Sequence, residues 1–121
     1  MKKKLVSTIL AATAVGSMLV TGVSAEEAKT YNIGICQLVQ HVALDAATEG
    51  FKDALTDKFG DAVNFDEQNA QGDSNTCSTI INGFVSNGVD LILANATPAL
   101  QAAQAGTAEI PILGTSVTEY G

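Results

Sequence analysis

The segment GVDLILANATPALQAAQAG, residues 88–106, contains the unit on which the fold prediction rests. A short apolar run at 89–94 is followed by an amphipathic stretch at 98–105 and then by Gly106. The run has the length of a buried strand, and a glycine just past a helix suits a left-handed C-terminal cap. This stretch therefore predicts a strand, a helix and a turn, in that order.

The same pattern occurs twice upstream. Residues 31–39 and 62–68 are predicted strands, 42–59 and 74–87 are predicted helices ending before Gly60 and Gly88, and 110–114 forms a fourth strand. Alternating strands and helices imply parallel strands joined by right-handed crossovers. We therefore expect an α/β fold, a doubly wound parallel sheet of strand order 2-1-3-4, with the first helix on one face and the other two helices opposite.

The first predicted helix has an apolar face and an acidic face. Apolar residues recur at helical spacing on one side and carboxylates on the other: Leu44, Ala47, Phe51 and Leu55, against Asp45, Glu49, Asp53 and Asp57. Evenly spaced carboxylates opposite a core indicate a solvated face rather than a cation site.

One face of this sheet would have a single helix to cover it. Parallel strands are normally buried on both faces, so we expect four apolar strand side chains to lack cover: Leu91, Leu93, Ile110 and Ile112. We interpret the 121 residues as the front of a longer protein.

The N-terminus has the pattern of a secretory signal. Three lysines at positions 2–4 precede an uncharged stretch at 5–23, and small residues end the segment at Ala25. We expect a signal peptide at 1–25, a short mature segment at 26–30 and one domain at 31–121. An uncleaved anchor is the alternative, because the stretch is long enough to span a bilayer. Without a cysteine at the cleavage point no lipid anchor is indicated, which predicts a periplasmic or secreted protein with no stable membrane anchor.

The net charge excludes several classes of partner. The chain has 13 acidic residues, six lysines and no arginine, for a net charge of −7. Removal of residues 1–25 would leave three lysines and a charge of −10. Such a surface repels nucleic-acid phosphates and anionic membranes, so neither is an expected partner.

The two cysteines allow two interpretations. Cys77 falls on the inward stripe of the second helix, which crosses over the first strand, where Cys36 lies. Both then lie near one end of the sheet, and export would permit a disulfide. A Cys36–Cys77 bridge and a pair of buried free thiols both stay open.

Four loops should meet at the carboxyl end of the sheet, where ligands of open parallel sheets bind: 37–41, 69–73, 95–99 and 115–119. Thr97 is a suitable N-cap and Pro98 suits the first turn, so the following amides could bind a carboxylate. An ordinary capped helix is the alternative. Asp73 and Ser74 are expected to cap the second helix without a ligand.

No residue pattern indicates catalysis or a cofactor. His41 is the sole histidine and lies four positions before Asp45, which leaves a metal site short of ligands. Dinucleotide, P-loop and nucleophile-elbow motifs are absent from the sequence. We therefore expect no cofactor, no metal and no enzymatic activity.

Three short motifs carry a family resemblance. HVALD at 41–45, NAQGD at 69–73 and ATPA at 96–99 occur in order. Together with the surrounding segments of residues 31–121, they resemble ABC-transporter substrate-binding proteins of the tryptophan/tyrosine-binding type, which have a two-lobed type I periplasmic-binding fold. The resemblance implies that the chain is the first lobe of such a protein.

The resemblance also implies a function and site residues. It implies an extracytoplasmic solute-binding protein that captures an amino-acid-like small molecule and delivers it to an ABC permease and its ATPase. Its implied ligand residues are Thr97 with the backbone of Ala96 and Ala99, then Gln37, His41 and Asp45 on the first loop, and Ser116 and Val117 on the near wall. Val42 departs from the family, which often has proline there, and the Cys36/Cys77 pair is not a general family feature.

Two other functions stay open from the sequence. One is a secreted α/β enzyme whose catalytic residues lie beyond Gly121, and the other is a sensory ligand-binding domain. A downstream sequence containing a second βαβ lobe would favour the binding protein.

Overall fold

The computed structural model describes residues 29–118. The predicted signal segment at 1–25 and most of the short segment at 26–30 lie outside the described residues. The elements in chain order are β4 (Tyr31–Gln37), α1 (Val42–Phe59), the 3₁₀ turn η2 (Gly60–Ala62), β5 (Val63–Asn69), α2 (Ser74–Asn87), β6 (Leu91–Asn95), α3 (Thr97–Gly106) and β7 (Ile112–Thr115).

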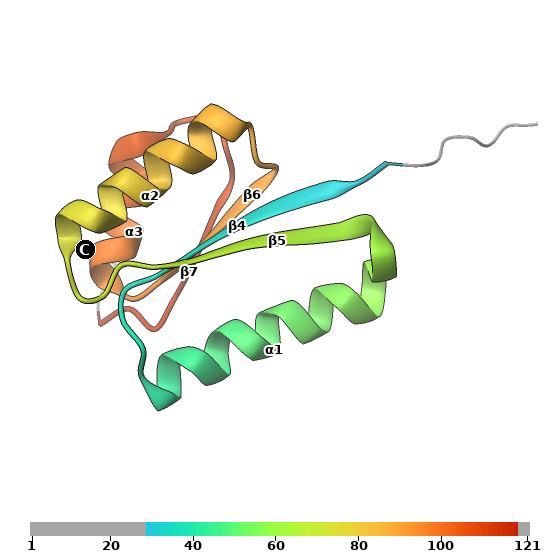
Figure 1. Ribbon diagram of the computed structural model, residues 1–121, viewed down its shortest axis with the longest axis horizontal. Helices are drawn as coiled ribbons and strands as arrows, with labels where there is room; N and C mark the ends of the chain where they lie inside the picture. The colour runs from blue at the N-terminus through green and yellow to red at the C-terminus, as the bar shows by residue number, and fades with distance from the viewer. Residues whose placement is uncertain (1–28, 119–121) are drawn as a thin grey trace, which may run out of the picture.

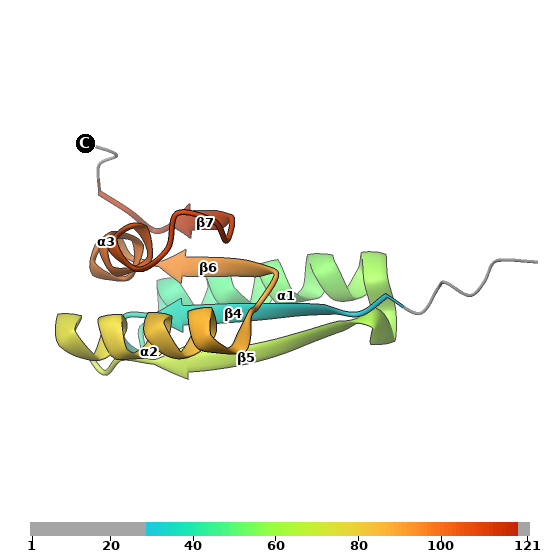
Figure 2. The same ribbon diagram turned by 90° about the horizontal axis from the view of Figure 1, so that it is seen from above.

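The four strands form one parallel sheet in the order β5-β4-β6-β7. This confirms the predicted order 2-1-3-4. Within the sheet Cys36 pairs with Ala94 and Gln37 pairs with Asn95, so β4 and β6 end side by side. Figure 2 shows β4, β5 and β6 with their arrowheads at the same end of the molecule.

Helices cover the two faces unequally, as predicted. α1 lies along one face, whereas α2 and α3 lie on the other (Figures 1 and 2). The α1 side of the core contains Ile33, Ile35 and Leu93 packed against α1 side chains, including Phe51 and Leu55. The opposite side holds a larger buried cluster, which includes Cys36, Cys77, Ile81, Phe84, Ile92 and Ala94.

The prediction that four apolar strand side chains lack cover is wrong for Leu93. Leu93 is only 1% exposed, because α1 packs over β6 as well as β4 and β5. Leu91, Ile110 and Ile112 are half-buried. The exposed side chain is Leu113, at 49%, which pairs with Leu93 in register but lies one strand further from α1.

Both ends of α2 follow the local sequence signals, whereas the predicted left-handed glycine cap is not found at the end of α1. α2 has the predicted bounds, with Asp73 accepting from the amide of Thr76 at 3.1 Å and Gly88 in the left-handed conformation (φ 67°). Gly60 has a positive φ of 56° but lies outside the left-handed helical region, with ψ −127°.

The predicted glycine cap of the third helix is wrong. Gly106 is the last residue of α3, and the extended Thr107 follows as the C-cap. The glycine is needed for another reason: a Cβ at position 106 would lie 2.7 Å from Cγ2 of Ile81. Absence of a side chain there lets α3 approach α2 closely.

The acidic face of α1 is solvated as predicted for Glu49, Asp53 and Asp57, but Asp45 is half-buried. Between residues 29 and 118, no group of three metal-ligating side chains gathers. In the same part of the chain, no helix combines the length and the apolar character needed to cross a bilayer.

Candidate site at the carboxyl ends of the strands

Backbone hydrogen bonds join the loops that follow the strands. The amide of Leu38 donates to the carbonyl of Asn95 at 3.1 Å, and the amide of Ala70 donates to the carbonyl of Gln37 at 2.9 Å. The amide of Ala96 donates to the carbonyl of Thr115 at 2.9 Å. The loops expected to meet at this end of the sheet therefore do meet.

An open hollow lies beside the first two of these loops. It has a volume of about 490 Å³ and is lined by Val39, Gln40, Asn69 and Gln71. Gln71 has a left-handed φ of 56°, and its amide donates to the side chain of Asn69 at 2.7 Å. This turn holds polar groups against the hollow, a lining suited to a polar small molecule.

A buried chain of side-chain hydrogen bonds runs beneath the same loops. Nδ2 of Asn95 donates to the hydroxyl of Thr48 at 2.8 Å, which donates to Oε1 of Gln37 at 2.7 Å. Nε2 of Gln37 then donates to Oδ1 of Asp45 at 2.7 Å and to the carbonyl of Val39 at 2.8 Å. Because a carboxylate and a carbonyl only accept, the chain has one direction, from Asn95 toward Asp45.

The orientation of Asn95 is fixed by a second bond. Its Nδ2 also donates to the carbonyl of Leu44 at 2.8 Å, which a flipped amide could not do. The side chain is 0% exposed, and its Oδ1 has no hydrogen-bond partner within the described part of the chain. A buried acceptor without a partner costs stability, so Asn95 is held here at an energetic disadvantage.

The start of α3 is strained at Ala96. This residue is the N-cap, with φ 98° and ψ 159°, a backbone region that only glycine adopts readily. Strain of this kind persists where the surrounding structure enforces it, and it is concentrated at functional sites. Leu100 donates to the carbonyl of Ala96 at 3.1 Å, which fixes the first turn of α3.

The N-cap prediction for Thr97 is wrong by one residue. Thr97 is the first helical residue, and its Oγ1 accepts from the amide of Thr118 at 3.2 Å instead of capping its own helix. Pro98 follows in the first turn and has no amide hydrogen to satisfy. The N-terminal end of α3, with its partial positive charge, remains at the carboxyl end of the sheet.

His41 is the N-cap of α1. Its Nδ1 accepts from the amide of Ala43 at 3.1 Å, while its carbonyl accepts from the amide of Asp45 at 2.7 Å. The side chain is exposed, and the following Val42 is 84% exposed. The His41 side chain therefore satisfies one of the amides in the first turn of α1.

The predicted site residues fall into three groups. Gln37 and Asp45 are hydrogen-bonded to each other, Ala96, Thr97 and Ala99 form the start of α3, and Ser116 and Val117 follow β7. Ala99 is 0% exposed and Ala96 is 7% exposed, so Thr97 is the accessible residue of this group. Ser116 is exposed with a left-handed φ of 60°.

Sequence reasoning missed Thr48 and Asn95, which connect the first two groups. A signal was present for Thr48: it lies four residues after Leu44 and three before Phe51, on the stripe that faces the sheet.

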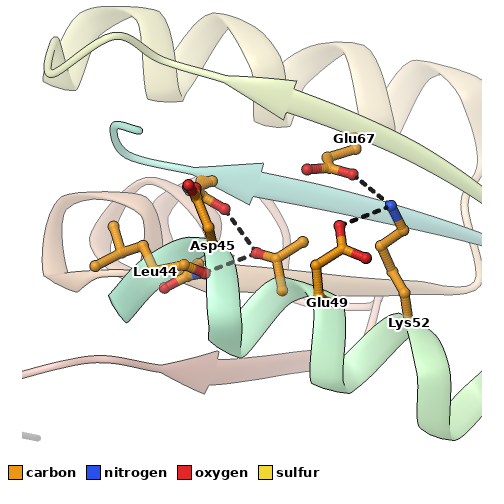
Figure 3. Close-up of polar contacts among 8 residues, drawn as sticks. Leu44, Asp45, Glu49, Lys52 and Glu67 are labelled. Carbon is orange, nitrogen blue, oxygen red and sulfur yellow. Dashed lines mark hydrogen bonds and ion pairs between the residues drawn. The ribbon is translucent and has the colours of Figure 1, made fainter. Parts of the chain in front are cut away.

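Asp45 is half-buried and hydrogen-bonded to Gln37, which distinguishes it from the exposed Glu49, Asp53 and Asp57 on the same helix. Lys52 bridges Glu67 at 2.9 Å and Glu49 at 3.4 Å, as Figure 3 shows, and the hydrogen bond with Glu67 is the main cause that raises the pKa of Lys52. Lys29 and Lys58 lie over the rings of Tyr31 and Phe59. Within residues 29–118, no lysine forms an ion pair with Asp45.

The two cysteines lie behind the site as free, fully buried thiols. Burial raises the pKa of Cys36 to about 12, with further contributions from the charge of Cys77 and the hydrogen bond between the two thiols. Burial also raises the pKa of Cys77.

Comparisons with known proteins agree with this fold. The sequence model of a family described as ABC transporter substrate binding protein matches residues 32–120. A tyrosine-binding protein of Clostridioides difficile is 42% identical over 133 residues, an alignment that covers 97% of this chain and 38% of that protein.

Two solved structures of similar proteins also match this chain in fold and sequence. The ligand-free, open structure of a substrate-binding protein with adhesive properties from Clostridium difficile is 45% identical, with a TM-score of 0.71 over 74% of this chain and 32% of that one. An ABC domain from Streptococcus pneumonia in complex with L-Trp is 32% identical, with a TM-score of 0.71 over 75% of this chain and 32% of that one. The chain therefore spans about a third of the length of the proteins it matches.

Proposed function

The chain belongs to the ABC transporter substrate-binding protein family, and on this premise we propose that it forms one lobe of an extracytoplasmic importer component that binds an amino acid. The proposed ligand is a small zwitterion, with an aromatic side chain as the first candidate. Relatives described as binding tyrosine or L-Trp support that choice. Because the relatives are described as binding proteins, the enzyme alternative has no support here.

The start of α3 carries the proposal. A helix N-terminus presents unpaired amides and a partial positive charge, which together suit a carboxylate. Here the strained Ala96 sets the direction in which that turn begins, and a bond from the loop after β7 holds Thr97. In our proposal the ligand carboxylate binds at Thr97, next to the backbone of Ala96 and Ala99. The Ala96 amide already donates to the carbonyl of Thr115 and Ala99 is 0% exposed, so Thr97 makes the direct contact.

Asp45 is the proposed partner for the ligand's ammonium group. Its Oδ1 is held by Gln37, which also bonds the carbonyl of Val39 on the wall of the hollow. The carboxylate is half-exposed and has no cationic partner within the described residues, so a ligand cation would supply the missing charge. Gln37 is only 3% exposed, which makes it a positioning residue for Asp45 rather than a large contact surface.

The remaining predicted residues would form the near walls. His41 lies one turn before Asp45 at the start of α1, and Ser116 and Val117 lie on the loop that is tied to α3. We propose that a second lobe, outside this chain, closes over the ligand by a hinge motion and that the closed form delivers it to a permease and ATPase. Cleavage of residues 1–25 and a periplasmic or secreted location belong to the same proposal.

Calorimetric titration of the full-length protein that contains this chain tests the proposal. We expect L-tyrosine or L-tryptophan to bind, and we expect tyramine, which lacks the carboxylate, to bind at least about tenfold more weakly, a difference of about 1.4 kcal/mol. Binding of a sugar or an inorganic ion, with no binding of any amino acid, would overturn the proposal.

A pair of variants tests the ammonium partner. Asp45→Asn keeps an oxygen acceptor for Gln37 but removes the charge, so it should weaken amino-acid binding while leaving binding of the deaminated analogue unchanged. Asp53→Asn, on the exposed face of the same helix, is the matched control and should change neither. Equal weakening of both ligands by Asp45→Asn would contradict the assignment.

A further inference from the structure

Two cysteines from distant parts of the sequence lie in the same buried cluster of the core. Cys36 lies in β4, which has a strand on either side and pairs it with Gln68 and Ala94. Cys77 lies in the first turn of α2, where its amide donates to the carbonyl of Asp73 at 3.1 Å. Both side chains are 0% exposed and belong to the same apolar cluster, and each influences the pKa of the other, which indicates that the two thiols lie close together.

Free cysteines are often buried as small apolar side chains, so the observation that points to a covalent link is that both occupy one cluster and influence each other's pKa. A thiol is a weak hydrogen-bond donor, and in an apolar cluster it has little else to bind. Within residues 29–118 no other cysteine is present, so the pairing has no competitor in the folded core. We propose that Cys36 and Cys77 form a disulfide, made by thiol–disulfide exchange with an external disulfide before the core closes.

The exchange balances in two steps. One cysteine thiolate attacks the external disulfide, forms a mixed disulfide and releases one thiol. The second cysteine thiolate then attacks the protein sulfur of that mixed disulfide, so that the S–S bond between residues 36 and 77 forms and a second thiol leaves. The two protein thiols are oxidised, the external disulfide is reduced, and it gains the two electrons and two protons.

The order of events follows from burial. In the folded chain neither sulfur is accessible, and burial holds both thiols protonated, whereas exchange needs an accessible thiolate. The bond therefore forms in the unfolded or partly folded chain. Once the core has closed, the same burial protects the bond from reductants.

The disulfide would connect two loops of the candidate site through the core: the loop after β4 and the loop that leads into α2. Cys36 directly precedes Gln37, and Cys77 is one turn after Asp73, so the link joins the loop after β4 to the start of α2. A backbone bond from Ala70 to Gln37 already connects these loops. The inference does not depend on the identity of any ligand.

Oxidative refolding of the full chain tests the proposal. The reduced, unfolded chain is refolded either with a mixture of reduced and oxidised glutathione or with a reductant alone, then denatured and alkylated. We expect the sample refolded with glutathione to take up no alkyl group and to have a mass two hydrogens below that of the reduced, unalkylated chain. Its digest should contain a peptide pair linked through Cys36 and Cys77. Its thermal midpoint should be higher than that of the reduced sample by on the order of 10 °C.

The double variant Cys36→Ala/Cys77→Ala is the matched control, and its midpoint should be the same in both buffers. Refolded wild-type chain that still takes up two alkyl groups, carries bound glutathione or forms disulfide-linked dimers would overturn the proposal. If neither sample folds, the fraction of chain that carries the Cys36–Cys77 bridge in glutathione buffer is compared with the fraction that carries it in denaturant. Equal fractions in the two solutions would also overturn the proposal.

Discussion

Asn95 donates a 2.8 Å hydrogen bond to the hydroxyl of Thr48, although 47 positions separate the two residues. The bond joins the end of β6 to the middle of α1 and continues through Gln37 to Asp45. One buried hydroxyl thus connects the residue that precedes the strained Ala96 with the carboxylate proposed to bind the ligand ammonium group.

Replacement of this hydroxyl should be costly. Thr48→Val keeps the side-chain volume but leaves Oε1 of Gln37 and one hydrogen of Asn95 without partners. We expect a loss of about 2–4 kcal/mol in the free energy of unfolding, measured by urea denaturation. Thr79→Val, which removes an exposed hydroxyl on α2, should change it by less than about 0.5 kcal/mol. Equal effects of the two changes would show that the network contributes nothing.

At Ala96, in contrast, we expect a substitution to increase stability. Strain at φ 98° and ψ 159° costs on the order of 1–3 kcal/mol for a residue with a side chain. Ala96→Gly should therefore raise the thermal midpoint, because relief of strain exceeds the added entropy of the unfolded chain, about 0.5–1 kcal/mol. Ala54→Gly, at an exposed position within α1, should lower the midpoint. A decrease in both variants would mean that Ala96 is not strained in solution.

Asp73 should make stability depend on pH. The hydrogen bond from the Thr76 hydroxyl, at 2.6 Å, is the main cause that lowers the pKa of Asp73 below its ordinary value of 3.8. Because the pKa of Asp73 is lower in the folded chain, its ionised carboxylate stabilises the fold at pH values above the pKa that it has in the unfolded chain. This stabilisation is lost as the pH falls through the pKa that it has in the folded chain.

Asp73→Asn isolates this contribution, because asparagine also caps helices but does not titrate. We expect the wild-type chain to have the higher thermal midpoint near pH 6 and the difference to vanish between about pH 4 and pH 2. A difference that stays constant over this range would contradict the assignment.

Two glycines should respond oppositely to alanine. A Cβ at Gly34, in the central strand β4, would lie 2.6 Å from the ring of Phe84, whereas a Cβ at Gly83 would meet no atom within 4 Å. Gly34→Ala should cost about 3 kcal/mol through overpacking. Gly83→Ala, on the exposed side of α2, should add about 0.5–1 kcal/mol. Urea denaturation measures both, and a tolerated alanine at 34 would mean that Phe84 can move aside.

The sheet could be predicted from sequence because its signals are local. Asp73 and Gly88 fix both ends of α2, and regular alternation of strands and helices fixes the strand order. Gly106 misled the prediction because the same residue type serves both for helix caps and for close packing of helices. Only the position of Ile81 distinguishes the two.

The candidate site was less predictable. The loops were located by topology, but the bond between Thr48 and Asn95 depends on how α1 crosses β6, which no local pattern encodes. The cap of α3 was misplaced because Ala96 adopts a conformation that its residue type disfavours. The Ala96 amide donates to the carbonyl of Thr115, a tertiary contact that no local pattern encodes, and the Ala96 carbonyl accepts the first helical bond of α3 from Leu100.

The two outer strands of the sheet differ in how they meet a new strand. β5 carries Asp66 and Glu67, and charged side chains on an outer strand oppose the pairing of another chain. β7 has no charged residue, and its Leu113 is 49% exposed. Within residues 29–118, charge therefore opposes the pairing of a further strand at the β5 edge, and no charge on β7 opposes it at the other edge.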